Sequence, residues 1–474
     1  MNYKEAAVPI RIILIIVIAC LSAGCMQVRQ AVKRPLGDDG ELFLYCEPFP
    51  QDASRLQFQV ESVSAVRDDG LTVPLTQEMK DFALLDMQRQ RLFAHGILPA
   101  GRYKGIAIKL KSASLLGEDG TGRLLVPERP YENNALFMVK NGKATVVTLE
   151  LNYRAALADR VTLHPAFDAR IPPVPLPELT GYLTNFASNT ITVFDRRSAG
   201  IGAMIETGRG PAGIALDKVR MLAYVALAGE DTIGVIDVKD NEFIDRIRLN
   251  PGDSPHFLVI TPDGKTAVTA NTRSNTVSIV DLQSRFEVAR IPVGNEPEYL
   301  LMDRNGRRVY VFNRLSNSIS VVDIAARAIA ATLVTESGPI YGQLSSKGDR
   351  LFVFHDMSPN ILVYQLDGQG ATRRIYAGMG VRAMKVNPAT DRIYVGNRMG
   401  GIIDVYDPFT LTAGDFLNAE GGASYMTIDG EENNLLIIHP RERLLRFINL
   451  ISKKENGLLD TGAEPYSLVI FGER

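Results

Sequence analysis

The stretch that decides the fold is YVFN at residues 310–313, followed after two residues by SNSISVVD at residues 316–323. Each half is typical of a short β-strand, because apolar and β-branched residues are bounded by Asn, Ser and Asp, which favour turns. Closely similar pairs occur as YLTN with SNTITVFD within residues 182–195 and as VTAN with SNTVSIVD within residues 268–281. The stretch is therefore one copy of an internal repeat.

The last residue of each copy sets a nearly constant period. It is Asp in five copies, Gln in the fifth and Asn in the seventh, and the successive spacings are 42, 44, 42, 42, 42 and 42 residues. Each copy has a further strand-like run before and after the quoted pair. Four short strands at this period describe one blade of a β-propeller, so seven copies predict seven blades. The marking residues are Asp195, Asp237, Asp281, Asp323, Gln365, Asp407 and Asn449.

Both ends of the repeat region hold an incomplete unit. The first copy begins at Gly181 without a first strand, whereas the final run, PYSLVI at residues 465–470, is a first strand alone. Pro465 keeps the position of the prolines that open four earlier copies. We therefore expect the C-terminal strand to complete blade one and close the ring, which satisfies strand edges that would otherwise be exposed. The four earlier prolines are Pro211, Pro255, Pro297 and Pro339.

The repeat motif resembles the YVTN-type, YncE-like family of β-propeller repeats over about residues 178–474. That resemblance implies the propeller fold. Relatives in this family include surface-layer-like proteins, periplasmic propellers and the d1-haem domain of certain nitrite reductases. The resemblance says little about function, because propellers host many activities.

The first 25 residues have the layout of a secretory signal. Lys4 and Arg11 supply positive charge, an aliphatic run follows, and the segment ends in LSAGC at Cys25. This ending is similar to the lipobox of bacterial lipoproteins, which implies cleavage before Cys25 and lipids on that cysteine. Cys20, after Val-Ile-Ala, is a rival lipidation site, and a plain signal peptide and an uncleaved anchor helix are competing interpretations of the segment. Met26 after the lipidated cysteine implies, by enterobacterial sorting, an outer-membrane anchor in the cell envelope.

Residues 26–170 show no such repeat. A weak helical signal covers about Thr76–Asp86. Strand-like runs occur at Glu41–Cys46, Leu56–Val63, Leu92–Ala94, Tyr103–Leu110 and Thr145–Leu151. The segment LPAGRY at residues 98–103 is similar to a motif of DUF4382-like β-sandwich modules in bacterial surface lipoproteins. We expect a β-sandwich here, an extended Pro-rich linker over residues 171–178, and the propeller over residues 179–474. Cys46, in an apolar run, is expected to be buried.

Two adjacent repeat positions predict a binding mouth around the propeller axis. The position after the opening proline holds His256, Glu298, Arg382 and Tyr466, and the next position holds Tyr299, Tyr341 and Tyr425. Such polar and aromatic side chains suit a ligand site. Because neighbours on a strand point opposite ways, we expect one of the two positions to pack between blades. Pairing of Glu298 with Arg382 is an alternative role.

A third repeat position, ten residues before each marking residue, holds Asn in four copies and His355 and His439 in two others. Asn is expected to cap the turn that follows by bonding to its own backbone. The two histidines are candidate metal or haem ligands, or they serve the turn in the same way. The marking acids themselves are expected to be turn acceptors.

These patterns favour a binding and scaffold protein, lipid-anchored in the bacterial envelope, whose propeller face recognises a protein or a glycan. No catalytic motif is present in the sequence, so we do not expect an enzyme. The net charge of −2 argues against nucleic acid, and no cofactor is expected. The alternatives are a cofactor- or metal-bearing propeller like the d1-haem relatives, and a propeller lactonase.

Overall fold

The computed structural model describes residues 36–83, 87–117, 120–366, 370–398 and 400–473. Both candidate lipidation sites, Cys25 and Cys20, lie outside these residues. The described part is almost entirely β-structure, and its one α-helix is the four-residue α2 (Tyr153–Ala156). No helix within the described ranges is long and apolar enough to cross a membrane.

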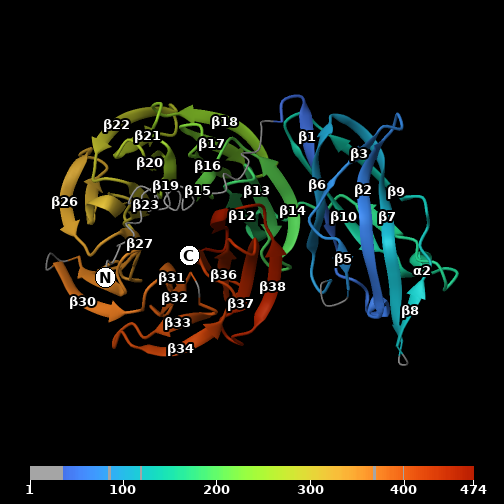
Figure 1. Cartoon of the computed structure of the whole chain (residues 1–474). Helices are drawn as coiled ribbons and strands as arrows, with labels where there is room; N and C mark the ends of the chain where they lie inside the picture. Colours follow the sequence, from blue (N-terminus) through green and yellow to red (C-terminus); the bar gives the residue numbers. More distant parts are fainter. Residues whose placement is uncertain (1–35, 84–86, 118–119, 367–369, 399, 474) are drawn as a thin grey trace, which may run out of the picture. The chain divides into compact units, whose positions relative to one another are not determined.

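The described residues after Thr180 form seven four-stranded sheets, the blades of a β-propeller. Figure 1 shows them in a ring, where the red strands of blade seven lie beside the green strands of blade one. Each blade is an antiparallel meander in sequence order except blade one, so each repeat unit folds locally. Blades one to three contain β12 (Thr180–Asn185), β13 (Thr190–Asp195), β14 (Gly200–Glu206); β15 (Pro211–Asp217), β16 (Leu222–Leu227), β17 (Thr232–Asp237), β18 (Glu242–Arg248); β19 (Pro255–Ile260), β20 (Thr266–Asn271), β21 (Thr276–Asp281) and β22 (Phe286–Pro292).

The later blades repeat this arrangement with little change in strand length. They contain β23 (Pro297–Met302), β24 (Arg308–Asn313), β25 (Ser318–Asp323), β26 (Ala328–Val334); β27 (Pro339–Leu344), β28 (Arg350–His355), β29 (Asn360–Gln365), β30 (Gly370–Tyr376); β31 (Val381–Val386), β32 (Ile393–Asn397), β33 (Ile402–Tyr406), β34 (Ala413–Asn418); β35 (Tyr425–Asp429), β36 (Asn434–His439), β37 (Leu444–Asn449) and β38 (Glu455–Asp460).

The C-terminal strand closes the ring, as expected. β39 (Pro465–Ile470) is the inner strand of blade one and pairs antiparallel with β12, with Gly181 opposite Ile470 and Leu183 opposite Leu468. Blade one is thus built from both ends of the repeat region. The predicted fold class, a seven-bladed propeller with this closure after a β-sandwich, is confirmed.

The marking acids hold the turn between the third and fourth strands. Asp195 Oδ1 accepts the backbone N–H groups of Arg197 and Ser198, at 2.8 and 2.9 Å. Asp407 accepts those of Phe409 and Thr410 in the same way, and Asn449 does so with an amide oxygen. An oxygen at this position is what the turn requires, which explains how Asn replaces Asp.

The Asn of the Ser-Asn pair links successive blades. Asn189, Asn275 and Asn317 have φ of 57°, 58° and 50°, the left-handed conformation that Asn tolerates better than most residues. Each Oδ1 accepts a backbone N–H from the loop that leads into the next blade, 21 residues later. The repeat motif therefore encodes contacts between blades as well as turns.

The N-terminal part is a sandwich of two sheets around a shared apolar core. The first sheet has the order β11-β10-β1-β6-β4; the second contains β3-β2-β7-β8, with β5 on β2 and β9 on β7. The strands are β1 (Asp39–Cys46), β2 (Leu56–Arg67), β3 (Thr72–Pro74), β4 (Thr76–Gln77), β5 (Asp81–Phe82), β6 (Arg91–Pro99), β7 (Gly101–Gly117), β8 (Gly120–Leu124), β9 (Tyr131–Val139), β10 (Ala144–Leu151) and β11 (Phe167–Arg170), with a 3-10 turn, η1 (Gln51–Ala53).

The helix expected over about Thr76–Asp86 is wrong for the described residues of that segment. They form β4 and β5, which pair with β6 and β2. Phe82 stacks on Phe58 with ring centroids 4.7 Å apart and meets Phe93 edge-on at 5.1 Å. Packing of this ring in the core overrides a weak local helical preference. Cys46 is fully buried, as expected.

The LPAGRY segment forms the corner between β6 and β7. Tyr103 is buried, stacks on Phe137 with centroids 5.1 Å apart, and donates its hydroxyl to the carbonyl of Pro99 at 2.9 Å. Gly101 has φ +149°, a conformation that side chains disfavour. The motif therefore fixes a corner and secures it with one partly buried hydrogen bond.

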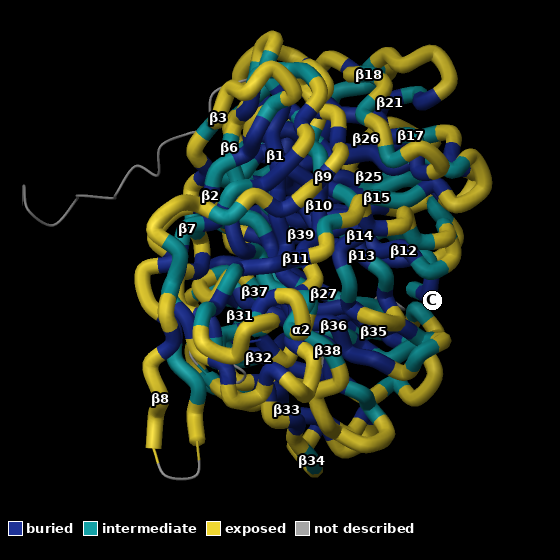
Figure 2. Tube along the Cα trace, turned by 90° about the vertical axis from the view of Figure 1, so that its right-hand side faces the viewer, coloured by how far each residue is buried: buried dark blue, intermediate teal, exposed yellow. Residues whose placement is uncertain are grey.

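The sandwich packs on the outer strands of blades one and seven. Phe43, Tyr45 and Val146 share an apolar cluster with Met204 of β14 and Leu459 of β38. Figure 2 shows this burial as dark tube through the interior strands, with exposed yellow tube in the connecting loops.

The chain between the domains, which includes the 3-10 turn η2 (Pro177–Leu179), follows the propeller closely. A Cβ on Gly202 would lie 2.2 Å from Pro175 Cδ.

Candidate functional site

A cavity of about 560 Å³ opens at the ring's axis where the first strands of the blades begin. It is lined by inner-strand residues from blades three to seven and from β39, and by loop residues that follow the second strands. All seven residues predicted for the mouth line this one cavity: His256, Glu298, Tyr299, Tyr341, Arg382, Tyr425 and Tyr466.

A β-bulge brings both predicted positions into the cavity. In blades three to six the register between first and second strands shifts directly after the opening residue, so two residues oppose one. Such a bulge re-aims side chains that would otherwise alternate. Glu298 and Tyr299 therefore face the same space. In blades three, four and six the second position is the more buried of the two, which agrees only in part with the expectation that one position packs between blades.

An aromatic group forms one wall of this mouth cavity. Ring centroids are 4.4 Å apart for Phe257 and Tyr299, 4.1 Å for Tyr299 and Tyr341, and 6.2 Å for Tyr341 and Tyr425. The rings come from four different blades. Burial raises the pKa of each of the three tyrosines well above its ordinary value of 10, so the hydroxyls stay neutral.

A second aromatic group lies on blades one and three. Phe186, in the loop after β12, lies 6.2 Å from His256 and 6.0 Å from Tyr466 between ring centroids. His256 Nδ1 is 3.1 Å from the carbonyl of Ser254, and burial lowers the pKa of its imidazole. His256 is therefore mostly neutral at pH 7 and offers a flat, hydrogen-bonding surface.

The charged side chains of the mouth form a network. Arg314 lies 3.0 Å from Glu296, 3.7 Å from Glu298 and 2.8 Å from Asp356, and Arg382 lies 2.9 Å from the other oxygen of Asp356. Glu298 and Arg382 are thus bridged by Arg314 and Asp356 and do not pair directly. Burial raises the pKa of Glu298, against the opposing effect of the two arginines.

The sequence reasoning missed Arg314 and Asp356. Both stand directly after the position that holds Asn or His at the end of the second strand, as do Phe186 and Arg398 of the cavity wall. This repeat position varies in chemistry from blade to blade. That variation was the available signal, because a position that only holds a turn repeats one residue type.

In three of its four blades the Asn position serves the hairpin through side-chain partners and not, as was expected, through the backbone of its own turn; Asn397 of blade six donates to the carbonyl of Met379 at 2.5 Å. Asn313 Nδ2 donates to the hydroxyls of Ser318 and Ser320 on β25, at 3.2 and 2.9 Å. Blades one and three repeat this pattern with Thr and Ser hydroxyls at the same offsets. In each of these blades the Asn at the end of the second strand donates to two hydroxyl groups on the third strand.

His355 and His439 stand where these hydroxyl partners are missing. The equivalent offsets hold Asn360 and Leu362 in blade five, and Leu444 and Arg446 in blade seven. Both imidazoles are buried, and burial lowers the pKa of His355 and brings that of His439 to about 4. Across the described ranges, no group of three or more His, Cys, Asp or Glu side chains could hold a metal. A structural role, with imidazole filling the hairpin, accounts for both.

The far end of the inner strands is held by the C-terminal tail. Glu473 accepts hydrogen bonds from Lys385 Nζ of β31 at 2.6 Å and from Thr427 Oγ1 of β35 at 2.7 Å. Lys218, after β15, donates to the carbonyl oxygens of Phe471 and Glu473 at 2.7 and 2.9 Å. The tail therefore ties blades two, six and seven together across the end of the axis opposite the mouth.

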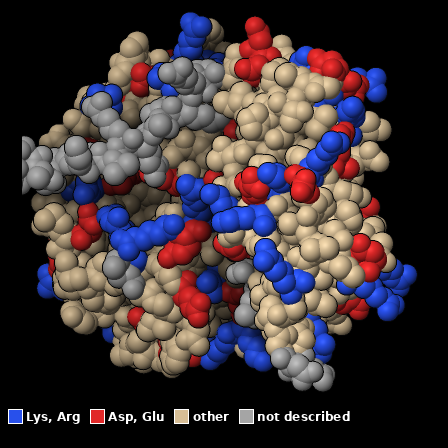
Figure 3. Space-filling model, turned by 45° about the vertical axis from the view of Figure 1, so that its right-hand side comes forward, with Lys and Arg blue, Asp and Glu red and all other residues tan. Residues whose placement is uncertain are grey.

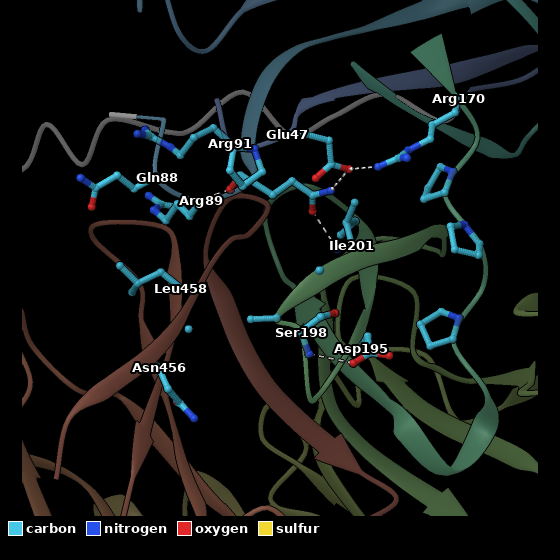
Figure 4. A pocket seen from close by; sticks show the side chains of 18 of the residues that line it. Glu47, Gln88, Arg89, Arg91, Arg170, Asp195, Ser198, Ile201, Asn456 and Leu458 are labelled. Atoms are coloured by element: carbon cyan, nitrogen blue, oxygen red, sulfur yellow. Dashed lines mark hydrogen bonds and ion pairs between the residues drawn. The ribbon is translucent and has the colours of Figure 1, made fainter. Parts of the chain in front are cut away.

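A second cavity, of about 730 Å³, lies where the sandwich meets blades one and seven. Gln90, which lines this cavity, donates to Glu47 at 3.0 Å and accepts the backbone N–H of Ile201 at 2.8 Å. Figure 4 shows Glu47, Arg170 and Ile201 among the residues around the cavity. Arg170 lies 3.6 Å from Glu47. Arg89 and Arg91 of the lining pair with Asp460, so this cavity is a polar seam between domains. On the face shown in Figure 3, cationic and anionic side chains are likewise interspersed.

Comparisons with known proteins agree with this architecture. A family model described as a YNCE-like beta-propeller matches residues 176–472. A structure titled Kuenenia stuttgartiensis hydrazine synthase is similar with a TM-score of 0.51 and 17% identity, covering 61% of this chain and 95% of that one. A functionally unknown protein from Desulfotomaculum acetoxidans DSM 771 gives a TM-score of 0.53 and 16% identity over 60% and 97%.

A third structure, titled dihydro-heme d1 dehydrogenase NirN in complex with DHE, gives a TM-score of 0.50 and 13% identity. It covers 64% of this chain and 78% of that chain. At these identities the structural likeness shows the fold alone. No curated protein matches the chain.

Proposed function

Because the chain belongs to the YNCE-like β-propeller family, we propose that it is a binding protein whose mouth cavity holds a protein or glycan partner. In this proposal Cys25 carries the lipid that tethers the protein to the bacterial cell envelope, on the outer membrane. The lipobox-like LSAGC segment supports the tether. Binding without catalysis is the activity proposed.

The observation that carries the proposal is the convergence of two kinds of side chain on one cavity. Tyrosine and phenylalanine rings from several blades provide wide, flat surfaces beside a buried charged network. Rigid aromatic side chains with charged neighbours are what protein hot spots and sugar-ring contacts use. A merely structural channel would be filled by aliphatic side chains from each blade.

Two rim arginines leave charge available to a partner. Arg398 and Arg441 are exposed at the cavity's edge, where they can meet an acidic group. By contrast, Arg314 and Arg382 are held by the acids of the network. The tail contacts of Glu473 at the opposite end of the axis favour a partner that approaches from the mouth side.

A site-specific photo-crosslinker tests this proposal directly. It replaces Phe186 at the mouth or, as a matched control, Val219, which is 87% exposed in the turn between β15 and β16 on the opposite face. We expect a discrete adduct in the native envelope from position 186 and none from 219. Loss of that adduct on protease or glycosidase treatment identifies the partner class. Equal labelling from both positions, or none from 186, contradicts the proposal.

The tether has its own test. Cys25→Ser is expected to move the protein from the membrane fraction to the released fraction, whereas Cys20→Ser leaves it membrane-bound. Membrane association of the Cys25→Ser variant contradicts a lipid on Cys25 while leaving the mouth proposal intact.

A further inference from the structure

The outer strand of blade four differs from the outer strands of all other blades. β26 has the sequence AIAATLV, seven residues without a charge, and six of them are exposed. The outer strands of blades two, three, five, six and seven each carry at least one charged residue, such as Glu287 in β22 or Asp415 in β34. Charged residues on an edge strand prevent pairing with other chains, so β26 lacks the usual protection.

Blade one shows what covers an outer strand with few charges in this molecule. β14, GIGAMIE, has its only charge at its end, and its Ile201 and Met204 are buried against Phe43, Tyr45 and Val146 of the sandwich. β26 is thus the outer strand poorest in charge, and β14 and β34 follow with one charge each. Of these three strands only β14 is covered by the sandwich within the described residues. By ring order, blade four is three blades away from both blade one and blade seven.

The sequence of β26 is complementary to itself in antiparallel orientation. Around Ala331 as the twofold centre, Ile329 of one copy faces Leu333 of the other, and Ala328 faces Val334. Outside the strand, Arg327 of one copy then faces Thr335 of the other, one residue before Glu336, whose carboxylate is held by Arg374 of its own chain. An isologous contact needs this property, because the same patch must fit itself. The apolar pairs recur on both sides of the centre, and the one polar residue of the strand, Thr332, faces Ala330.

The neighbouring outer strand extends the apolar face. Phe286 and Val288 of β22 are 72% and 38% exposed, and Arg327 Nη1 donates to the carbonyl of Val288 at 3.2 Å, which links the two strands. The register between β25 and β26 shifts at Ala330, so a bulge interrupts the ladder there. Side-chain burial must therefore supply much of the contact, with backbone bonds limited to the rest of the strand.

We propose that a second copy of this chain docks on β26, so that β26 of one copy lies antiparallel beside β26 of the other with Ala331 at the centre. The proposal does not depend on the mouth cavity, which lies on the axis and stays open in such a dimer.

Equilibrium sedimentation of residues 26–474, which contain the compact unit Pro35–Arg474, tests the proposal over micromolar to submillimolar concentrations. We expect the wild-type mass to double across this range. Thr332→Lys, which places a charge on the strand, is expected to weaken association by about tenfold or more. Ile244→Lys on β18, an outer strand that already carries four charges, is the matched control and should dimerise like the wild type.

A cysteine at the proposed centre gives a second readout. Directly opposed residues in an antiparallel pair have Cα atoms about 4.5–5.5 Å apart, which suits a disulfide. Ala331→Cys is expected to form a disulfide-linked dimer under mild oxidation, because Cys46, the other thiol, is buried. Ile244→Cys should not. A wild type that stays monomeric throughout, or Thr332→Lys associating as tightly as wild type, overturns the proposal.

Discussion

Arg196 of blade one and Asp429 of blade seven form a buried ion pair across the seam where the ring closes. Their side chains are 1% and 0% exposed, and Arg196 Nη1 lies 2.6 Å from Asp429 Oδ2. Arg196 Nε also donates to the carbonyl of Glu178 at 3.0 Å, ahead of β12. The closing strand β39 is thus supported by an electrostatic contact on the neighbouring strands of both blades.

Removing one partner of this pair should destabilise the propeller strongly. Asp429→Asn leaves the buried Arg196 with the half-exposed carboxylate of Glu431 as its close counter-charge, so the cost should lie near the lower end of the about 3–5 kcal/mol expected for breaking a buried pair. Arg197→Met, which breaks an exposed contact with Glu432, is the control and should cost under about 1 kcal/mol. Urea unfolding followed by far-ultraviolet circular dichroism measures both, since the chain has no tryptophan. Similar midpoints for the two variants would contradict a role for the buried pair.

The Asn275 contact with Glu296 can be separated into its two components. Asn275 supplies a left-handed backbone and a side chain that accepts the Glu296 N–H at 2.8 Å. Asn275→Gly keeps the backbone and loses the bond, so about 1 kcal/mol should be lost; Asn275→Ala loses both and should cost about 2 kcal/mol. Equal urea midpoints for the two variants would show that the conformation contributes nothing.

The sequence predicted the propeller well because each blade is a local unit. Strands, turns and ring closure follow from the spacing of residues such as Asp281, Asn275 and Pro465, whose partners are close in sequence or fixed by the period. The sandwich was harder, because its pairings are non-local. β9 was missed since exposed Leu136 and Met138 alternate with buried Phe137 and obscure the two-residue period.

The candidate site could be predicted in part for the same reason. The periodic position after each opening proline indicated the mouth residues, including Tyr299 and Arg382. The bulge that turns both adjacent positions inward has no signal in a single copy. Arg314 and Asp356 were hidden beside a position expected to serve only a turn. The ion pair between Arg314 and Asp356 joins two neighbouring blades. Whether such residues meet depends on the radius of the ring and on how each blade is offset from the next, which the repeat period does not give.

The junction of the two domains contains a histidine that should respond to alkaline pH. His95 lies 3.4 Å from Glu41 and 3.2 Å from Glu78, and Glu78 lies 3.3 Å from Arg443 of blade seven. The two carboxylates raise the pKa of His95 to about 9. The charged imidazole therefore stabilises the fold fully below its unfolded pKa near 6.5, and that contribution is lost as the pH rises through 9.

We expect the wild type to lose about 2 kcal/mol more than His95→Gln between pH 6.5 and 9.5, after allowance for partial exposure. Urea midpoints across this range measure the difference. Parallel profiles for the two proteins would mean that His95 is not protonated in the folded state.

His439 should act in the opposite direction and in a separate pH window. Burial, with Arg446 nearby, lowers its pKa to about 4, so the folded state holds a neutral imidazole while the unfolded chain takes up a proton near 6.5. Its contribution to stability is complete above pH 6.5 and is lost as the pH falls through 4, by about 3 kcal/mol. His439→Asn, which restores the residue found in four other blades, should flatten the stability profile in that interval and leave the interval from 6.5 to 9 unchanged.

His95→Gln is the matched control for His439→Asn, because it should alter only the alkaline interval. A His439→Asn profile that falls in parallel with the wild type below pH 6.5 would show that this imidazole is already protonated inside the hairpin, and the hairpin-filling role assigned to it would then be wrong.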